Sequence, residues 1–70
     1  MGKIQASMAG SVWKVLVGVG DQIDEGQDVV ILESMKMEMP INSTVSGSVK
    51  AVYCIAGDAV ASGAVLMEIE

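Results

Sequence analysis

The chain has 70 residues, which suits one small domain near the lower limit for burying its own core. With one cysteine and no histidine, the sequence excludes an internal disulfide and makes a structural zinc site hard to build. A formal net charge of −5 argues against a surface for nucleic acids or anionic membranes, because such surfaces need clustered Lys and Arg.

The predicted elements are strands. Glycines interrupt most windows long enough for a stable helix, and the apolar segments are short and rich in β-branched residues. Short strands separated by glycine turns at regular spacing are typical of an all-β sandwich or barrel. In chain order, we expect strands at residues 4–7, 11–17, 27–34, 37–42, 48–54 and 64–69, with short extended segments around Ile23 and Val60.

The chain consists of one β-rich unit written twice. A shift of thirty-seven positions aligns residues 1–33 with residues 38–70 without a gap. The matching positions are mostly turn glycines and strand-type apolar residues, such as Gly10-Ser11-Val12 over Gly47-Ser48-Val49. Each copy alone has too few strands to cover its apolar face. We therefore expect a pseudo-two-fold axis between the halves, and we expect that neither half folds by itself.

One lysine lies in the segment that has no counterpart in the repeat, residues 34–37. Because this segment joins the two copies, the expected axis places Lys36 at the end of the molecule opposite the chain termini. A fusion partner at either terminus would then leave the lysine free to be visited by other proteins.

The residues around Lys36 fit a hairpin with a two-residue loop, Met35-Lys36. This register places Glu33 opposite Glu38, a like-charge pair that weakens a sheet. Tight hairpin loops also favour positive φ, which Asn and Gly reach at lower cost than Met or Lys. The like-charge pair and the unfavourable loop residues occur together at the same hairpin tip, which indicates that these residues serve function rather than folding. In this register the inside and the outside of the hairpin separate cleanly apart from Ile31. The face expected to point inward carries Val30, Leu32, Met37, Met39 and Ile41, and the outer face carries Glu33, Glu38, Pro40 and Asn42.

An exposed lysine beside carboxylates is a poor catalyst. A free lysine amine is protonated at neutral pH and is a weak nucleophile, and neighbouring carboxylates favour the charged form. Lys36 is better suited to be modified by another enzyme, which could remove the proton in its own active site. The plain alternative, which holds for most exposed lysines, is a solvated turn residue.

The run Met-Lys-Met, preceded by Glu-Ser, resembles the biotinyl domain of biotin-dependent carboxylases and decarboxylases, and in particular the small stand-alone biotin/lipoyl attachment proteins. The resemblance covers essentially the whole chain as one domain, residues 1–70, and includes Gly10-Ser11-Val12-Trp13-Lys14-Val15 and Ile31-Leu32-Glu33. It implies a flattened β-barrel (barrel-sandwich hybrid) of two four-stranded antiparallel sheets with internal pseudo-two-fold symmetry.

The resemblance also implies a function. In that family a biotin protein ligase joins biotin to the lysine between two methionines, here Lys36, with Met35 and Met37 as flanking recognition residues. The domain would be a non-catalytic carrier that moves carboxylate between biotin carboxylase and carboxyltransferase or decarboxylase components. Three polar neighbours are further candidates for contact with the ligase: Glu33, Ser34 and Glu38.

Two alternatives remain. Lipoyl domains share the fold and the hairpin lysine but usually read Asp-Lys-Ala at the tip, so Met-Lys-Met favours biotin over a lipoyl carrier for acyl transfer. An unmodified β-module acting through protein contacts would tolerate replacement of Lys36.

A cytoplasmic location is expected, because the N-terminus lacks a secretory signal and no apolar run approaches the roughly 20 residues of a membrane span.

Overall fold

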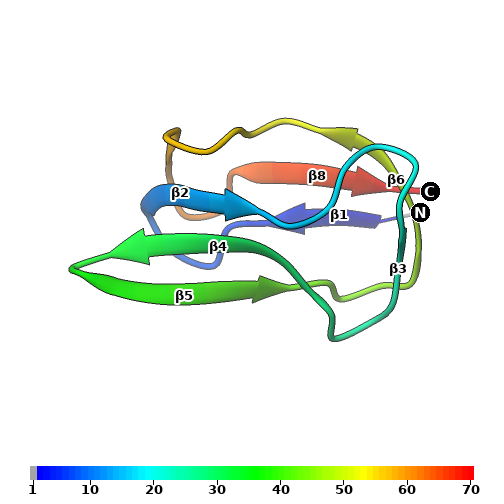
Figure 1. Cartoon of the computed structure of the whole chain (residues 1–70), viewed down its shortest axis with the longest axis horizontal. Coiled ribbons are helices and arrows are strands. Elements are labelled where there is room, and N and C mark those ends of the chain that lie inside the picture. Colours follow the sequence, from blue (N-terminus) through cyan, green and yellow to red (C-terminus); the bar gives the residue numbers. More distant parts are fainter. Residues whose placement is uncertain (1) are drawn as a thin grey trace.

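The computed structural model describes residues 2–70 as eight strands in two four-stranded antiparallel sheets (Figure 1). One sheet has the order β1-β8-β6-β3 and the other the order β5-β4-β2-β7. No helix in the described part of the chain is long and apolar enough to cross a membrane. The strands are β1 (Gly2–Gln5), β2 (Gly10–Val15), β3 (Gln22–Ile23), β4 (Asp28–Ser34), β5 (Met37–Asn42), β6 (Gly47–Val52), β7 (Ala59–Val60) and β8 (Val65–Ile69).

These strands confirm the predicted all-β class and the two four-stranded antiparallel sheets. The two halves contribute equally to both sheets, and a shift of thirty-seven positions converts the strand order of one sheet into that of the other. Within each half, one pairing occurs, β2 with β4 or β6 with β8, and the other pairings join the halves. Because an isolated strand pair is marginal in water, this topology supports the expectation that neither half folds alone.

The tight turns repeat with the strands. The carboxylate of Asp21 accepts a hydrogen bond from the amide of Gly18 at 2.8 Å, and the carboxylate of Asp58 accepts one from the amide of Ile55 at 3.0 Å. The glycine before each aspartate has a positive φ, 93° in the first half and 99° in the second. A glycine reaches this region without the steric cost that a Cβ would bring. The same tight Gly-Asp turn is therefore present in both copies.

The core lies between the two sheets and draws side chains from both halves. It is largely aliphatic, as expected for a chain without phenylalanine. Every buried side-chain nitrogen or oxygen of residues 2–70 has a hydrogen-bond partner. The largest fully buried side chains are Ile4, Val12, Ile23, Val29, Val30, Leu32, Leu66, Met67 and Ile69.

The β4–β5 hairpin projects from one end of the molecule (Figure 1). β1 begins and β8 ends at the opposite end, so the tip of the hairpin and the chain termini are separated along the longest dimension, 31 Å. This placement is the one that the sequence repeat predicts. The barrel therefore separates the hairpin tip from the start of β1 and the end of β8.

A hydrogen bond between Tyr53 and Glu68 gives a pH-dependent signal of the folded state. The tyrosine hydroxyl donates to the carboxylate at 2.7 Å, and this bond, with smaller effects of desolvation and of the Glu68 charge, raises the pKa of Tyr53 above its ordinary value. The stability contributed by this bond is present below the unfolded pKa and is lost as the pH rises through the folded pKa. Absorbance titration follows the chain's one tyrosine directly. We expect Glu68→Ala to lower the pH at the midpoint of the tyrosine titration. An unchanged midpoint would contradict the assignment of the raised pKa to Glu68.

Candidate functional site

Lys36 lies at the tip of the β4–β5 hairpin, in a loop of two residues. The strands pair in the predicted register, with Ser34 opposite Met37 at the last pair before the loop. Met35 and Lys36 have φ values of 52° and 63°, as a primed hairpin turn requires. All other residues with positive φ in the described chain are glycines. Backbone strain in residues that carry a Cβ, about 1–3 kcal/mol each, is thus confined to the tip.

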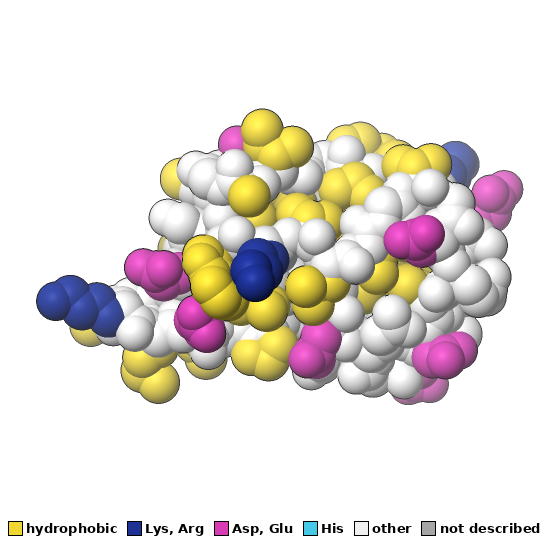
Figure 2. Space-filling model, in the orientation of Figure 1, with side chains coloured by type: hydrophobic (Ala, Val, Ile, Leu, Met, Phe, Trp, Pro, Cys, Tyr) yellow, Lys and Arg dark blue, Asp and Glu magenta, His cyan; other side chains and the backbone are white. Residues whose placement is uncertain are grey.

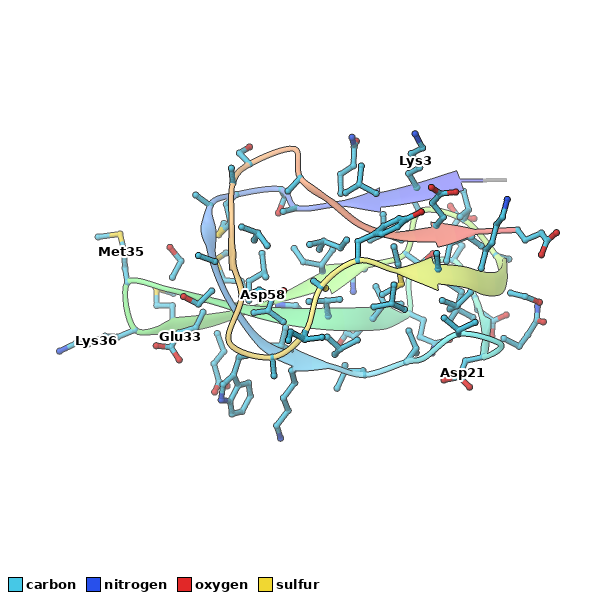
Figure 3. All side chains as sticks on the ribbon, turned by 90° about the horizontal axis from the view of Figure 1, so that it is seen from above. Lys3, Asp21, Glu33, Met35, Lys36 and Asp58 are labelled. Carbon is cyan, nitrogen blue, oxygen red and sulfur yellow. The ribbon has the colours of Figure 1, made fainter. Side chains whose placement is uncertain are left out.

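The tip residues are exposed. In Figure 3 the side chain of Lys36 points away from the barrel and that of Met35 stands free beside it. Met35 is 93% exposed and Met37 is 63% exposed. Met37 is on the same face of β5 as the buried Ile41, as the register predicts, but the hairpin reaches past the opposite sheet and leaves it uncovered. The expectation of a uniformly buried inner face therefore fails at Met37.

The three polar candidates lie directly behind the tip. Glu33 and Glu38 are opposite each other in the strand register, and both are exposed. Ser34 is partly buried. Glu33 pairs with Glu38 of β5 on one side and with Ser11 of β2 on the other. Figure 2 shows the resulting surface: a lysine projects from the hairpin end of the molecule, and acidic side chains lie behind it. A protein that binds at Lys36 would therefore come close to these carboxylates.

Gly10 also shapes the site, and its position there was not predicted. It begins β2 rather than forming a turn, and a Cβ at this position would lie 2.8 Å from the carbonyl oxygen of Glu33. Only glycine lets β2 pack this closely against the base of the hairpin. The sequence repeat is the signal that could have revealed this role, because it aligns Gly10 with Gly47. A Cβ at Gly47 would likewise lie too close to the carbonyl oxygen of Glu70.

The tip has the character of an attachment point. Two cavities of about 190 and 160 Å³ are lined by residues of β1 and its neighbours, and neither includes a residue of the hairpin loop. Within residues 2–70, no group of three or more His, Cys, Asp or Glu is arranged to hold a metal. A primary amine at an exposed tip is suited to form an amide bond with a carboxylic acid such as biotin. The residues present therefore fit a covalently attached group.

Comparison with known proteins agrees with this geometry. Residues 2–69 match the Biotin_lipoyl family model, described as "Biotin-requiring enzyme". The chain is 54% identical over 66 residues to the biotin/lipoyl attachment protein of Bacillus subtilis, covering 94% of this chain and 90% of that protein. It is 40% identical over 67 residues to the mitochondrial propionyl-CoA carboxylase alpha chain of Homo sapiens, of which it spans 9%.

The fold has a close match among solved structures. The urea carboxylase of Kluyveromyces lactis contains a region that superposes with a TM-score of 0.91 and 33% sequence identity. The match covers 99% of this chain and 6% of that much longer one. The fold and the family predicted from the sequence are both confirmed, and the chain belongs to the Biotin_lipoyl family of biotin-requiring enzymes.

Proposed function

We propose that this chain is a biotin carboxyl carrier in which biotin is joined through an amide bond to Nζ of Lys36. One observation carries the assignment of the residue: the lysine lies between two exposed methionines on a strained hairpin tip of a Biotin_lipoyl domain. Asn and Gly would form the same turn with less strain, so the fold itself does not require Met and Lys at these positions. The loop is therefore better explained by what it presents than by how it folds.

The chain contributes position rather than catalysis. The hairpin carries Lys36 beyond the barrel, and the chain ends are at the other end, so a partner can approach the tip without meeting them. When bound, biotin supplies a ring nitrogen that accepts and releases a carboxylate group. Met35 and Met37 offer apolar contact on both sides of the amine. These features support a domain that carries a group between active sites located on other proteins or domains.

The partners in this proposal follow from the family. Carboxylases occur among the relatives, and in them the matching region is a small part of a long chain. This domain would receive biotin from a biotin protein ligase and then serve a biotin carboxylase and a carboxyltransferase or decarboxylase component. It would act as a non-catalytic subunit or domain, and the expected cytoplasmic location belongs to the same proposal.

Mass spectrometry tests the proposal. The protein is expressed with a biotin ligase and, separately, with a lipoate ligase, and any added mass is mapped by digestion. A biotin adduct confined to Lys36 is the expected result. Addition of lipoate alone would change the assignment to an acyl carrier. No adduct under either condition would favour a β-module that acts without modification.

Removing the two tip carboxylates should slow ligation without unfolding the domain. For Glu33→Gln with Glu38→Gln we expect the initial rate with ligase to fall roughly three- to tenfold at low ionic strength, because charges near a binding surface steer association. Stability should stay the same or rise by up to about 1 kcal/mol, since a like-charge pair across strands is lost. The matched control is Asp24→Asn with Glu25→Gln, an equal charge change at exposed turn residues. Equal rates for the two double variants would reject the role.

A further inference from the structure

Methionine exposure divides sharply along this chain. Met35 and Met37, which flank Lys36, are exposed by 93% and 63%, whereas Met67 is fully buried in the core. Met8 and Met39 are partly buried. A thioether is oxidised without first losing a proton, so access of the oxidant to the sulfur decides which methionine reacts. The two most accessible thioethers of residues 2–70 are therefore those on either side of the candidate attachment amine.

We propose that Met35 and Met37 form a peroxide-sensitive modification site that controls whether Lys36 can be biotinylated. The proposal rests on the function assigned above. In the reaction, the sulfur lone pair attacks one oxygen of hydrogen peroxide, an S–O bond forms, the O–O bond breaks, and water leaves. The sulfur loses two electrons, which the peroxide gains. Methionine sulfoxide reductases reverse the change.

Oxidation at the tip should spare the fold. Partly buried residues such as Met8 and Val15 pack against the core, and neither tip methionine is among them. Because Met35 and Met37 cover little of the protein's own apolar surface, sulfoxide oxygens there remain in water and leave the core packing intact. The modified domain keeps its barrel, and the change is confined to the surface around Lys36.

Oxidation at the tip should nevertheless block modification. A ligase that closes over Lys36 must also cover the two side chains beside it, because they are the loop and first strand positions next to the amine. In the reduced state these side chains are flexible and apolar. Each sulfoxide adds a hydrogen-bond acceptor that loses its water on contact, and burying an unpaired polar group is unfavourable. Oxidation therefore acts on ligation rather than on folding.

The test uses the unmodified domain and graded hydrogen peroxide, which is removed by catalase before any ligase is added. Among the methionines of residues 2–70, digestion and mass spectrometry should find sulfoxide first at Met35 and Met37, and last at Met67. Once both tip methionines are oxidised, the thermal unfolding midpoint should be unchanged. The initial rate of biotin ligation should fall about tenfold or more, and treatment with sulfoxide reductase should restore it.

Two variants separate the outcomes. Met35→Leu with Met37→Leu keeps apolar side chains of similar volume that cannot be oxidised, so peroxide should leave its ligation rate unchanged. Met8→Leu is the matched control, and it should remain as sensitive as the parent chain. Full-rate ligation with both tip sulfoxides in place would overturn this inference and leave the carrier function standing. A chain that ligase never modifies before peroxide would instead overturn the carrier function, while the order of oxidation would still be measured.

Discussion

We expect Lys36→Arg to abolish biotin attachment and the carboxylation that depends on it, while the barrel stays folded. Arginine keeps the positive charge and a long flexible stem at an exposed position, but its guanidinium stays protonated and does not become an acylated amine. Both residues carry a Cβ, so the strain of the positive φ at this position is retained. Stability should therefore stay within about 0.5 kcal/mol of the parent chain. Intact mass, thermal unfolding and a carboxylation assay with partner components measure the three expectations.

The matched control for this variant is Lys14→Arg. The amine of Lys14 lies 4.5 Å from the centroid of the Trp13 ring, a cation–π contact that arginine can also make. It is on β2, away from the hairpin loop. This variant should be biotinylated at the parent rate. Carboxylation retained by Lys36→Arg, or an adduct on Lys3, Lys14 or Lys50, would contradict the assignment of the attachment site.

The sequence repeat predicted the topology because the glycines and apolar residues of both copies occupy equivalent places in the fold. The hairpin register could also be read from sequence, since shifting it by one residue would bury Glu33 and expose Leu32. The observed pairing of Glu33 with Glu38 and of Leu32 with Met39 follows that logic. Predicted strand boundaries differ from the observed ones by at most two residues, because strand ends depend on turn hydrogen bonds.

Features that depend on neighbouring backbone were not predictable from pattern alone. The strand register shifts between Val12 and Lys14 and again between Val49 and Ala51, so Trp13 and Lys50 are unpaired at corresponding β-bulges. The repeat aligns these two residues, but a tryptophan and a lysine share no feature that marks a bulge. The exposure of Met37 was missed for a similar reason. How far a hairpin reaches past the opposite sheet is set by tertiary packing, not by alternation of residue types.

Replacing the tip dipeptide with Asn-Gly should make the domain more stable and leave it without the amine to modify. In Met35→Asn with Lys36→Gly, both residues reach positive φ more cheaply, so the free energy of unfolding should rise by about 1–3 kcal/mol. In a domain of this size each kcal/mol raises the melting temperature by about 4–8 °C. Thermal and denaturant unfolding measure the gain, with Met35→Ala and Lys36→Arg together as the control that keeps a Cβ at both positions.

The single change Met35→Asn separates strain from attachment. It retains Lys36, so the amine is still present, while the first loop position becomes compatible with its φ of 52°. We expect this variant to be more stable than the parent chain by about 1 kcal/mol and to be biotinylated more slowly, because an apolar contact beside the amine is lost. Equal stability would show that the first loop position stores no strain. Greater stability with an unchanged ligation rate would show that Met35 is dispensable, and the reason for a costly loop would then rest with Lys36 alone.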